Sequence, residues 1–313
     1  MGSASVALRS AVRPFLEKLE AGDSFLVAVS GGADSLALAK ALLIESEPLA
    51  LNAIAITIDH QLQENSHLQA EKVSAQLKEI GYGQVITKKV VVVLDSGLES
   101  GARDARYAAI DESMEETKAV KVFLGHTFND QAETVLLGLA RGSGTRSLSG
   151  MAEENGIYLR PLLAILRDET EAACKEWSLD FWNDPHNLNT EFTRVKVRRE
   201  VIPYLEEHLD PGISKALVRT AALLRDDADA LDLWAEAEAT DLDCERLATL
   251  PKAIRTRIIR QAAFAAGATP GKLTFEQVGA IDALICAWKG QGEVSLAGGV
   301  KVERISGRLS LSR

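Results

Sequence analysis

The stretch FLVAVSGGADSLALAKALL, residues 25–43, places a glycine-rich turn between an apolar strand-like run and a helical pattern. This arrangement aims the N–H groups of the turn and the positive end of the helix dipole at one point, which suits a phosphate. Gly31 and Gly32 let the backbone approach an anion closely. The familiar phosphate loop ends in a lysine, whereas this one carries Asp34, and a carboxylate beside a polyphosphate suggests a bridging Mg²⁺. The plainer alternative is a tight turn with Ser35 as the helix cap.

The same strand-then-helix pattern recurs along the chain. Apolar, β-rich runs that end in polar residues are followed by helical patterns at LNAIAITIDH (51–60), VITKKVVVVL (85–94) and KVFLGH (121–126). Repeated βα units predict an α/β fold, Rossmann-like, with a parallel sheet and helices on both faces.

Polar clusters lie where three of these strands end. SGGADS follows the first strand, DH ends the second, and GHTFND follows the fourth. Ligands of parallel sheets bind at the carboxyl ends of the strands. We therefore expect these three segments to meet at one crevice.

The chain is long enough for two domains, since it has 313 residues. The strand–helix alternation gives way to long helical patterns after Pro203. We place the domain boundary near Pro211–Gly212, giving domains 1–211 and 212–313. The second domain is predicted to be mainly helical, with helices at about 214–239, 251–265 and 275–288. It ends in a hairpin of two strands, EVSLAGGVKVERI and GRLSLS.

Charge is unevenly distributed. The net charge is −10, yet residues 251–313 hold ten Lys+Arg, Arg255 and Arg257 among them, against four Asp+Glu, a balance of +6. A basic tail domain fits a polyanion such as a nucleic acid, although a solvated surface gives the same count. No apolar run is long enough to span a bilayer and the N-terminus lacks a signal-peptide core, so we expect no membrane partner and a cytoplasmic location.

Several segments together indicate a family. SGGADS resembles the SGGxDS loop of the N-type ATP pyrophosphatases, the PP-loop superfamily. Further segments resemble motifs of the bacterial tRNA(Ile)-lysidine synthases across residues 25–205, namely IDHQLQENS (58–66), GARDARYAAI (101–110), GHTFNDQAETVLLGLARGSGTRSLSGM (125–151) and FTRVKVRREVIPYL (192–205). The run around RGSG is the most specific.

The resemblance implies a ligase that forms a carbon–nitrogen bond in two steps. ATP with Mg²⁺ adenylates the wobble cytidine of a tRNA(Ile) with a CAU anticodon and releases pyrophosphate. L-lysine then displaces AMP, and the resulting lysidine reads AUA in place of AUG. A loop base can be unstacked into a pocket for such chemistry. The C-terminal module would bind the tRNA, and relatives of this kind are often homodimers.

The resemblance also implies an ATP site. The residues that match it are Ser30, Gly31, Gly32, Ala33, Asp34 and Ser35 in the loop, with Ile58 and Asp59 beside the adenine. Asp34 would act in catalysis and bind the metal. Its alternative role is that of an acidic residue favoured by the helix dipole.

A second set of residues matches the lysine and tRNA sites. Catalytic roles are assigned to Asp130, Arg106 and His126, and Asp130 is also the second metal ligand. Asp130 and Glu133 would hold the lysine, and Arg103, Arg194 and Arg198 would contact the tRNA or phosphates. Arg141, Gly142, Ser143 and Gly144 would form a loop beside the substrate pocket. Asp130 and Glu133 share a helix face. The alternatives are helix capping for these two carboxylates and solvated basic faces for Arg103 and Arg106 and for Arg194 and Arg198.

The sequence departs from the family pattern at four positions. Asn129 replaces an aspartate, Thr127 a histidine, Gln63 an arginine and Val195 an asparagine. Asn129 and the acidic net charge suggest a catalytically silent nucleotide- or RNA-binding protein as one rival. The other rival, a tRNA sulfur transferase of the same fold, needs paired cysteines, and the three present are far apart.

Overall fold

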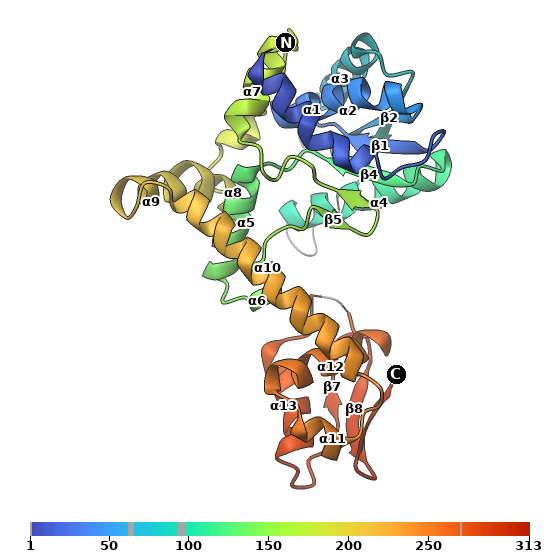
Figure 1. Ribbon diagram of the computed structural model, residues 1–313, viewed down its shortest axis with the longest axis vertical. Coiled ribbons are helices and arrows are strands. Elements are labelled where there is room, and N and C mark those ends of the chain that lie inside the picture. The colour runs from blue at the N-terminus through green and yellow to red at the C-terminus, as the bar shows by residue number, and fades with distance from the viewer. Residues whose placement is uncertain (1, 62–65, 93–97, 270) are drawn as a thin grey trace. The chain divides into compact units, whose positions relative to one another are not determined.

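The computed structural model describes residues 2–61, 66–92, 98–269 and 271–313 (Figure 1). The chain divides into two compact units, Met1–Ala222 and Leu223–Arg313. The long helix α10 (Ile213–Glu238) contains the residue at which they divide. Within the described residues, no helix is both long and apolar enough to cross a membrane.

A six-stranded sheet forms the centre of the first unit. Its strands are β1 (Ser24–Ala28), β2 (Asn52–Asp59), β3 (Gln84–Lys89), β4 (Lys121–Leu124), β5 (Glu154–Asn155) and β6 (Tyr158–Leu159). Their order is β3-β2-β1-β4-β6-β5, and every pair is parallel except β5 with β6. The chain leaves β1 toward β2 on one side and later returns to β4 on the other. The carboxyl end of β1 is therefore the switch point at which such sheets bind ligands.

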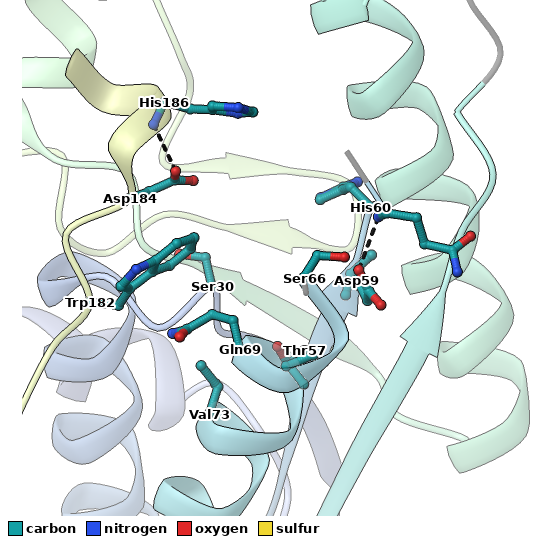
Figure 2. A pocket seen from close by; sticks show the side chains of 13 residues that line it. Ser30, Thr57, Asp59, His60, Ser66, Gln69, Val73, Trp182, Asp184 and His186 are labelled. Carbon is teal, nitrogen blue, oxygen red and sulfur yellow. Dashed lines mark hydrogen bonds between the residues drawn. The ribbon is translucent and has the colours of Figure 1, made fainter. Parts of the chain in front are cut away.

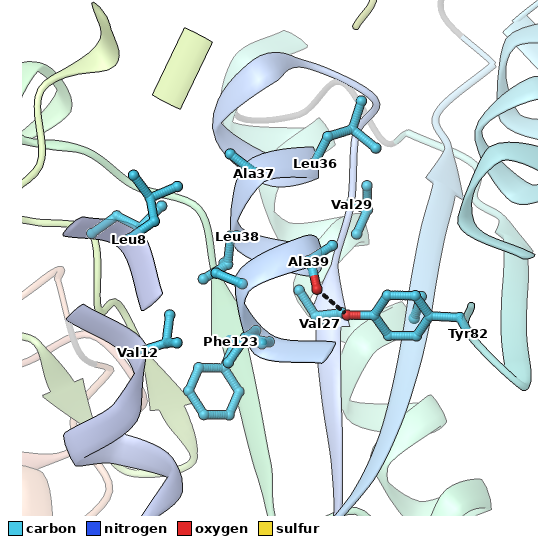
Figure 3. Packing of buried hydrophobic residues seen from close by; sticks show 14 of the residues in the cluster. Leu8, Val12, Val27, Val29, Leu36, Ala37, Leu38, Ala39, Tyr82 and Phe123 are labelled. Atoms are coloured by element: carbon cyan, nitrogen blue, oxygen red, sulfur yellow. Dashed lines mark hydrogen bonds between the residues drawn. The ribbon is translucent and has the colours of Figure 1, made fainter. Parts of the chain in front are cut away.

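Helices cover both faces of this sheet, which confirms the predicted fold class. On one face lie α1 (Ser3–Leu16), α2 (Ala33–Ser46), α3 (Ser66–Ile80) and α7 (Arg167–Glu176). Figure 3 shows Leu8 and Val12 of α1 beside Leu38 of α2 and Phe123 of the sheet. The other face is covered by α4 (Leu98–Thr117), whose Ile110 packs in a separate cluster with strand residues.

The remaining elements of the first unit follow β4 and α7. They are α5 (Phe128–Ala140), α6 (Thr145–Leu148), a 3₁₀ turn (Pro185–Leu188), α8 (Thr193–Lys196), a π-helical turn (Val197–Val201) and α9 (Ile202–His208); a further 3₁₀ turn (Glu47–Leu49) precedes β2. Both Arg194 and Arg198 lie in the short α8–π segment. That segment brings them to α5, as described below.

The second unit joins helices to a small antiparallel sheet. Its elements are α11 (Cys244–Thr249), α12 (Lys252–Ala265), α13 (Phe275–Cys286), β7 (Val294–Ser295), β8 (Lys301–Ile305) and β9 (Arg308–Ser312), with strand order β7-β8-β9. The predicted hairpin therefore has a third strand. Gly298 and Gly299 have φ angles of 97° and 79° and reverse the chain between β7 and β8. The segment EVSLAGGVKVERI, predicted as one strand, is therefore divided into two.

Two arginines of the predicted basic surface are engaged in ion pairs. Arg255 is 7% exposed and donates to Asp282 and to the carbonyl of Leu250. Arg257 donates to Asp232 at 2.7 Å. Both arginines are therefore paired with carboxylates, which a formal charge count does not reveal.

Candidate active site

The loop after β1 has the geometry expected of a phosphate site. Gly31 lies at φ 88°, and a Cβ at this position would meet Val73 of α3 at 2.5 Å, so only glycine fits. The Ser35 hydroxyl accepts from the Ser30 N–H at 3.2 Å and donates to the Gly32 carbonyl at 3.0 Å. The loop is thus held open by its own hydrogen bonds at the start of α2.

The segment after β4 lies directly against this loop. A Cβ on Gly125 would stand 3.1 Å from Ser35 Cα and 3.2 Å from the Asp34 carbonyl oxygen. Glycine therefore permits the close approach of two segments that are about 90 residues apart in sequence. The contact places the GHTFND residues beside the phosphate loop, as the topology predicts.

A network of charged side chains links this segment to its neighbours. Its members are the carboxylates of Asp34, Asp130 and Glu133 and the guanidinium groups of Arg167, Arg194 and Arg198. The formal charges cancel. Glu133 is 1% exposed and is bonded by both Arg194 and Arg198, so the predicted pair of arginines contacts the predicted carboxylates.

Asp130 has two sets of partners. Its Oδ2 accepts from the backbone N–H and the hydroxyl of Thr127, both at 2.9 Å. Its Oδ1 accepts from Arg198 at 3.1 Å and Arg167 at 3.2 Å. Asp130 is therefore a capping residue and a member of the charge network at once, and Thr127 has a structural role as the cap of α5.

Arg167 is a site residue that the sequence did not reveal. It is the first residue of α7, and its Nε donates to Asp34 Oδ2 at 3.1 Å while its Nη2 donates to Asp130 Oδ1 at 3.2 Å. Its backbone N–H donates to Asn129 Oδ1 at 3.0 Å. An amide oxygen and a carboxylate oxygen accept this bond alike, which gives a physical reason for Asn129 being tolerated.

The pKa values of the two carboxylates bonded to Arg167 are shifted in opposite directions. Burial raises the pKa of Asp34 more than Arg167 and the Thr170 hydroxyl lower it. Burial also acts to raise the pKa of Asp130, but Arg167, Arg194 and the Thr127 N–H outweigh it and hold this pKa below its usual range. Two carboxyl groups whose pKa values differ in this way are suited to different roles in acid–base chemistry.

His126 and Arg106 carry buried nitrogen atoms that no described residue satisfies. Neither His126 Nδ1 nor Arg106 Nε has a hydrogen-bond partner within the described ranges. Burial lowers the pKa of His126 to about 3, so its ring is neutral at pH 7. Arg160, 6% exposed, is a further residue of this kind that the sequence did not reveal. Unsatisfied buried donors call for a ligand with acceptor atoms.

Arg103 and Arg106 are associated with one ring rather than with the charge network. Their guanidinium carbons lie 5.1 and 5.5 Å from the centroid of Tyr107. Burial lowers the pKa of Arg106, whereas Arg103 is exposed on α4. The predicted contact of Arg103 with tRNA stays a prediction.

A cavity of about 120 Å³ opens beside the phosphate loop (Figure 2). Its lining includes Ser30, Ile58 and Asp59. The structure brings these three residues together, and their contact with ATP stays a prediction. Asp59 Oδ1 accepts from the Gln61 N–H, and no described residue bonds its buried Oδ2. The volume is below the roughly 300 Å³ at which pockets for drug-sized ligands begin, so the cavity matches one part of a nucleotide.

The segment after α7 supplies the rest of this lining. Trp182, Asp184 and His186 face Gln69 of α3 across the cavity in Figure 2. The Trp182 N–H donates to the Gly31 carbonyl at 2.9 Å, which joins this segment to the phosphate loop. No local sequence pattern relates this segment to the phosphate loop about 150 positions earlier.

The RGSG loop is not brought into the charge network. Arg141, Gly142, Ser143 and Gly144 follow the end of α5, whereas Asp130 and Glu133 lie in its first two turns. At about 1.5 Å rise per residue the loop lies roughly 16 Å along the helix from Asp130. Its predicted role beside the substrate stays a prediction, and Gln63 lies outside the described residues.

Asp34 and Asp130 are suitable in kind and number for a nucleotide-bound Mg²⁺. Such an ion usually takes one or two carboxylates and completes its shell with phosphate oxygens and water. The described residues contain no group of three or more acidic, His or Cys side chains that would hold a metal by themselves. A metal here would therefore depend on ligands that the nucleotide supplies.

Two family models match this chain, one in each of its two units. A family model described as a PP-loop domain, an ATP-binding domain, matches residues 5–205. A tRNA(Ile)-lysidine synthase of Thermobifida fusca is 48% identical over 312 residues, covering 97% of this chain and 96% of that protein. The chain belongs to the tRNA(Ile)-lysidine synthase family.

Other matches agree with this family. A tRNA(Ile)-lysidine synthase of Streptomyces coelicolor is 50% identical over 294 residues, covering 91% of this chain and 84% of that protein. Residues 242–310 match a model described as the TilS substrate binding domain. Among solved structures, the U34-tRNA thiolase NcsA of Methanococcus maripaludis has a TM-score of 0.58 at 19% identity and covers 71% of this chain and 80% of its own. That likeness concerns the fold alone.

Proposed function

We propose that the protein uses Mg²⁺ and ATP to join L-lysine to the wobble cytidine of a tRNA(Ile) with a CAU anticodon. The observation that carries the proposal is the charge network, in which Asp34 of the ATP-binding loop shares a guanidinium with Asp130 of the acidic site. Under this proposal the ATP subsite and the amine-binding subsite would lie side by side. Both half-reactions need that arrangement, because the base activated in the first is attacked in the second.

In the first step the carbonyl oxygen at C2 of the cytosine attacks the α-phosphorus of ATP. The new O–P bond forms while the bond between the α- and β-phosphates breaks, and pyrophosphate leaves. The N–H groups of residues 30–35 and the dipole of α2 hold the departing phosphates. Asp59 Oδ2, buried and unbonded by described residues, is our choice to accept a hydrogen bond from the nucleoside.

Mg²⁺ bound by Asp34, Asp130 and phosphate oxygens would offset the charge of the triphosphate. The unsatisfied donors of Arg106 and Arg160 are suited to acceptor atoms of the incoming nucleotide. His126 is neutral at pH 7, so it can accept or donate a hydrogen bond there without adding charge.

In the second step an amine of lysine attacks C2 of the adenylated ring, and AMP leaves with the electrons of the C2–O bond. Asp130 and Glu133 would hold the lysine amine. Arg194 and Arg198 keep these carboxylates in place by three hydrogen bonds to Glu133 and one to Asp130. The amine loses its proton before or during attack, and we assign the acceptor role to a carboxylate of the network.

The second unit would bind the tRNA. Lys252, Lys272 and Lys289 are exposed on it and are suited to phosphate contacts. Such contacts release counterions, so affinity for tRNA falls steeply with salt. A homodimeric assembly and a cytoplasmic location follow from the resemblance and complete the proposal.

The state of the described cysteines argues against a sulfur transferase. All three are free, and burial raises the pKa of Cys174 to about 12. Cys174 is therefore not a thiolate at neutral pH. Sulfur transfer also needs paired cysteines, and the three present are far apart in the sequence.

The test is transfer of labelled lysine. Protein, Mg-ATP, radiolabelled lysine and an unmodified tRNA(Ile) transcript with a CAU anticodon are mixed, and label retained on the tRNA is counted. We expect label that disappears when the wobble cytidine is changed to uridine. Intact tRNA binding without incorporation of label would instead support a catalytically silent RNA-binding protein.

A further inference from the structure

Arg167 is the one cation, among the described residues, that contacts both Asp34 and Asp130. Asp34 lies on α2 and Asp130 on α5, so the guanidinium joins two elements that carry different substrates under the proposed function. Its two donors, Nε and Nη2, are fixed in one plane. The distances of 3.1 and 3.2 Å show that both bonds form at once.

Asp34 depends on α7 more than Asp130 does. The other side-chain partner of Asp34 is the hydroxyl of Thr170, one turn along α7 from Arg167. Asp130 also receives Arg198, and Glu133 is bonded by Arg194 and Arg198. Removing Arg167 therefore leaves Asp34 without a cationic partner among the described residues, whereas the lysine-side carboxylates keep theirs.

The site of Arg167 is sheltered enough for these contacts to matter. Its side chain is 22% exposed, that of Asp34 is 21% and that of Asp130 is 11%. Charge-assisted hydrogen bonds gain strength as water is excluded. The backbone bond from Arg167 to Asn129 fixes the start of α7 beside α5, so the guanidinium has little freedom to leave.

We propose that Arg167 is the positioning residue that joins the ATP subsite to the lysine subsite. The proposal rests on the proposed function. The rigid guanidinium fork sets the separation of Asp34 and Asp130, so that the adenylated base formed beside one lies within reach of the amine held by the other. Lysine at this position carries a point charge and cannot reproduce the fork.

The alternative is that Arg167 only stabilises the fold. Ion pairs in sheltered sites contribute little net stability in many proteins, yet removing one partner is destabilising. A purely structural role therefore changes the thermal midpoint and leaves the kinetic constants of the folded protein unaltered. The two roles are separable by measuring both half-reactions together with thermal unfolding.

The experiment compares wild type with Arg167→Met and Arg167→Lys. Adenylation is followed as tRNA-dependent exchange of pyrophosphate into ATP without lysine, and the lysine subsite through the KM for lysine in the full reaction. We expect Arg167→Met to slow exchange about 100-fold and to raise the lysine KM about 10-fold, as loss of charged hydrogen bonds implies. Arg167→Lys should fall between wild type and Arg167→Met in both measurements.

Arg9→Met is the matched control. Arg9 is also 22% exposed and pairs with Glu45, near the far end of α2 from the phosphate loop. We expect it to lower the thermal midpoint as Arg167→Met does, because Glu45 is buried and loses one of its partners. Both kinetic measurements should stay within about twofold of wild type, because neither residue belongs to the charge network.

Three results would overturn the inference. They are a change in only one of the two measurements, no change in either with Arg167→Met folded, and equal kinetic losses in the Arg9→Met control. If Arg167→Met does not fold, Arg167→Lys decides alone, with losses in both measurements supporting the inference and a loss in one opposing it. Wild type that binds tRNA but incorporates no lysine would instead remove the proposed function.

Discussion

The two units use the same pairing of arginine with carboxylate in different ways. In the second unit Arg255 has one carboxylate partner, Asp282, and their side chains are only 9% and 13% exposed. In the first unit three arginines share three carboxylates, and Arg194 and Arg198 remain 26% and 27% exposed. The closed pair joins α12 to α13, whereas the arginines of the shared network are partly exposed and lie near the ends of the strands. The two sites contain the same residue types. They differ in the solvent exposure of the arginines and in the number of carboxylates that each arginine contacts.

The largest effect is expected at Asp34. Asp34→Ala should lower pyrophosphate exchange by about 1,000-fold or more, because the proposed function assigns this carboxylate to the α-phosphate and Mg²⁺. Binding of tRNA, measured by filter retention, should stay within about threefold of wild type. Loss of tRNA binding in the folded variant would show that the phosphate loop has another task.

Breaking the closed pair of the second unit should cost stability and leave chemistry intact. Arg255→Met leaves Asp282 buried without its partner, and we expect the second unit to lose about 3 kcal/mol of unfolding free energy. The double variant Arg255→Met, Asp282→Leu should regain most of this loss. Lysine incorporation at a temperature where the single variant is folded should be near that of wild type; a large loss there would erase the distinction between the units.

A smaller effect is expected within the shared network. Glu133→Gln keeps the shape of the side chain but removes the charge that holds Arg194 and Arg198, so the KM for lysine should rise about 30-fold. Pyrophosphate exchange without lysine should change by less than about threefold. Equal effects on both would mean that Glu133 serves the fold and not the lysine subsite.

The smallest effect is expected at Asn129. Asn129→Asp retains an oxygen that accepts the Arg167 N–H, so lysine incorporation should stay within about threefold of wild type. Asn129→Ala removes the acceptor and should reduce the rate by about 10-fold. A large gain with Asn129→Asp would indicate that the present chain lacks a carboxylate the reaction needs.

The sequence was sufficient for the parts of the site that depend on local pattern. Gly31 and Gly32 between an apolar run and a helix predicted the phosphate loop, and the strand ends predicted that Asp59 and the residues after β4 would lie near it. The spacing of Asp130 and Glu133 indicated one helix face, and both contact the arginines of the α8–π segment.

The residues that sequence reasoning did not find owe their positions to distant packing. Arg167 is 133 positions from Asp34 and Trp182 is about 150 from the phosphate loop, and no periodicity relates residues so far apart. Arg255 and Asp282 were each visible as charges, yet only the packing of α12 on α13 pairs them. Such contacts are set by topology and side-chain shape, which one sequence does not encode in a readable spacing.

Gly125 has a consequence for how this gene can vary. A single methyl group there points at the backbone of Asp34 and Ser35, where neither neighbour is a flexible side chain that can swing aside. At Gly144, by contrast, the space within 4 Å is empty. We therefore expect almost every amino-acid change at Gly125 to displace the phosphate loop, whereas Gly144 has steric room for a side chain.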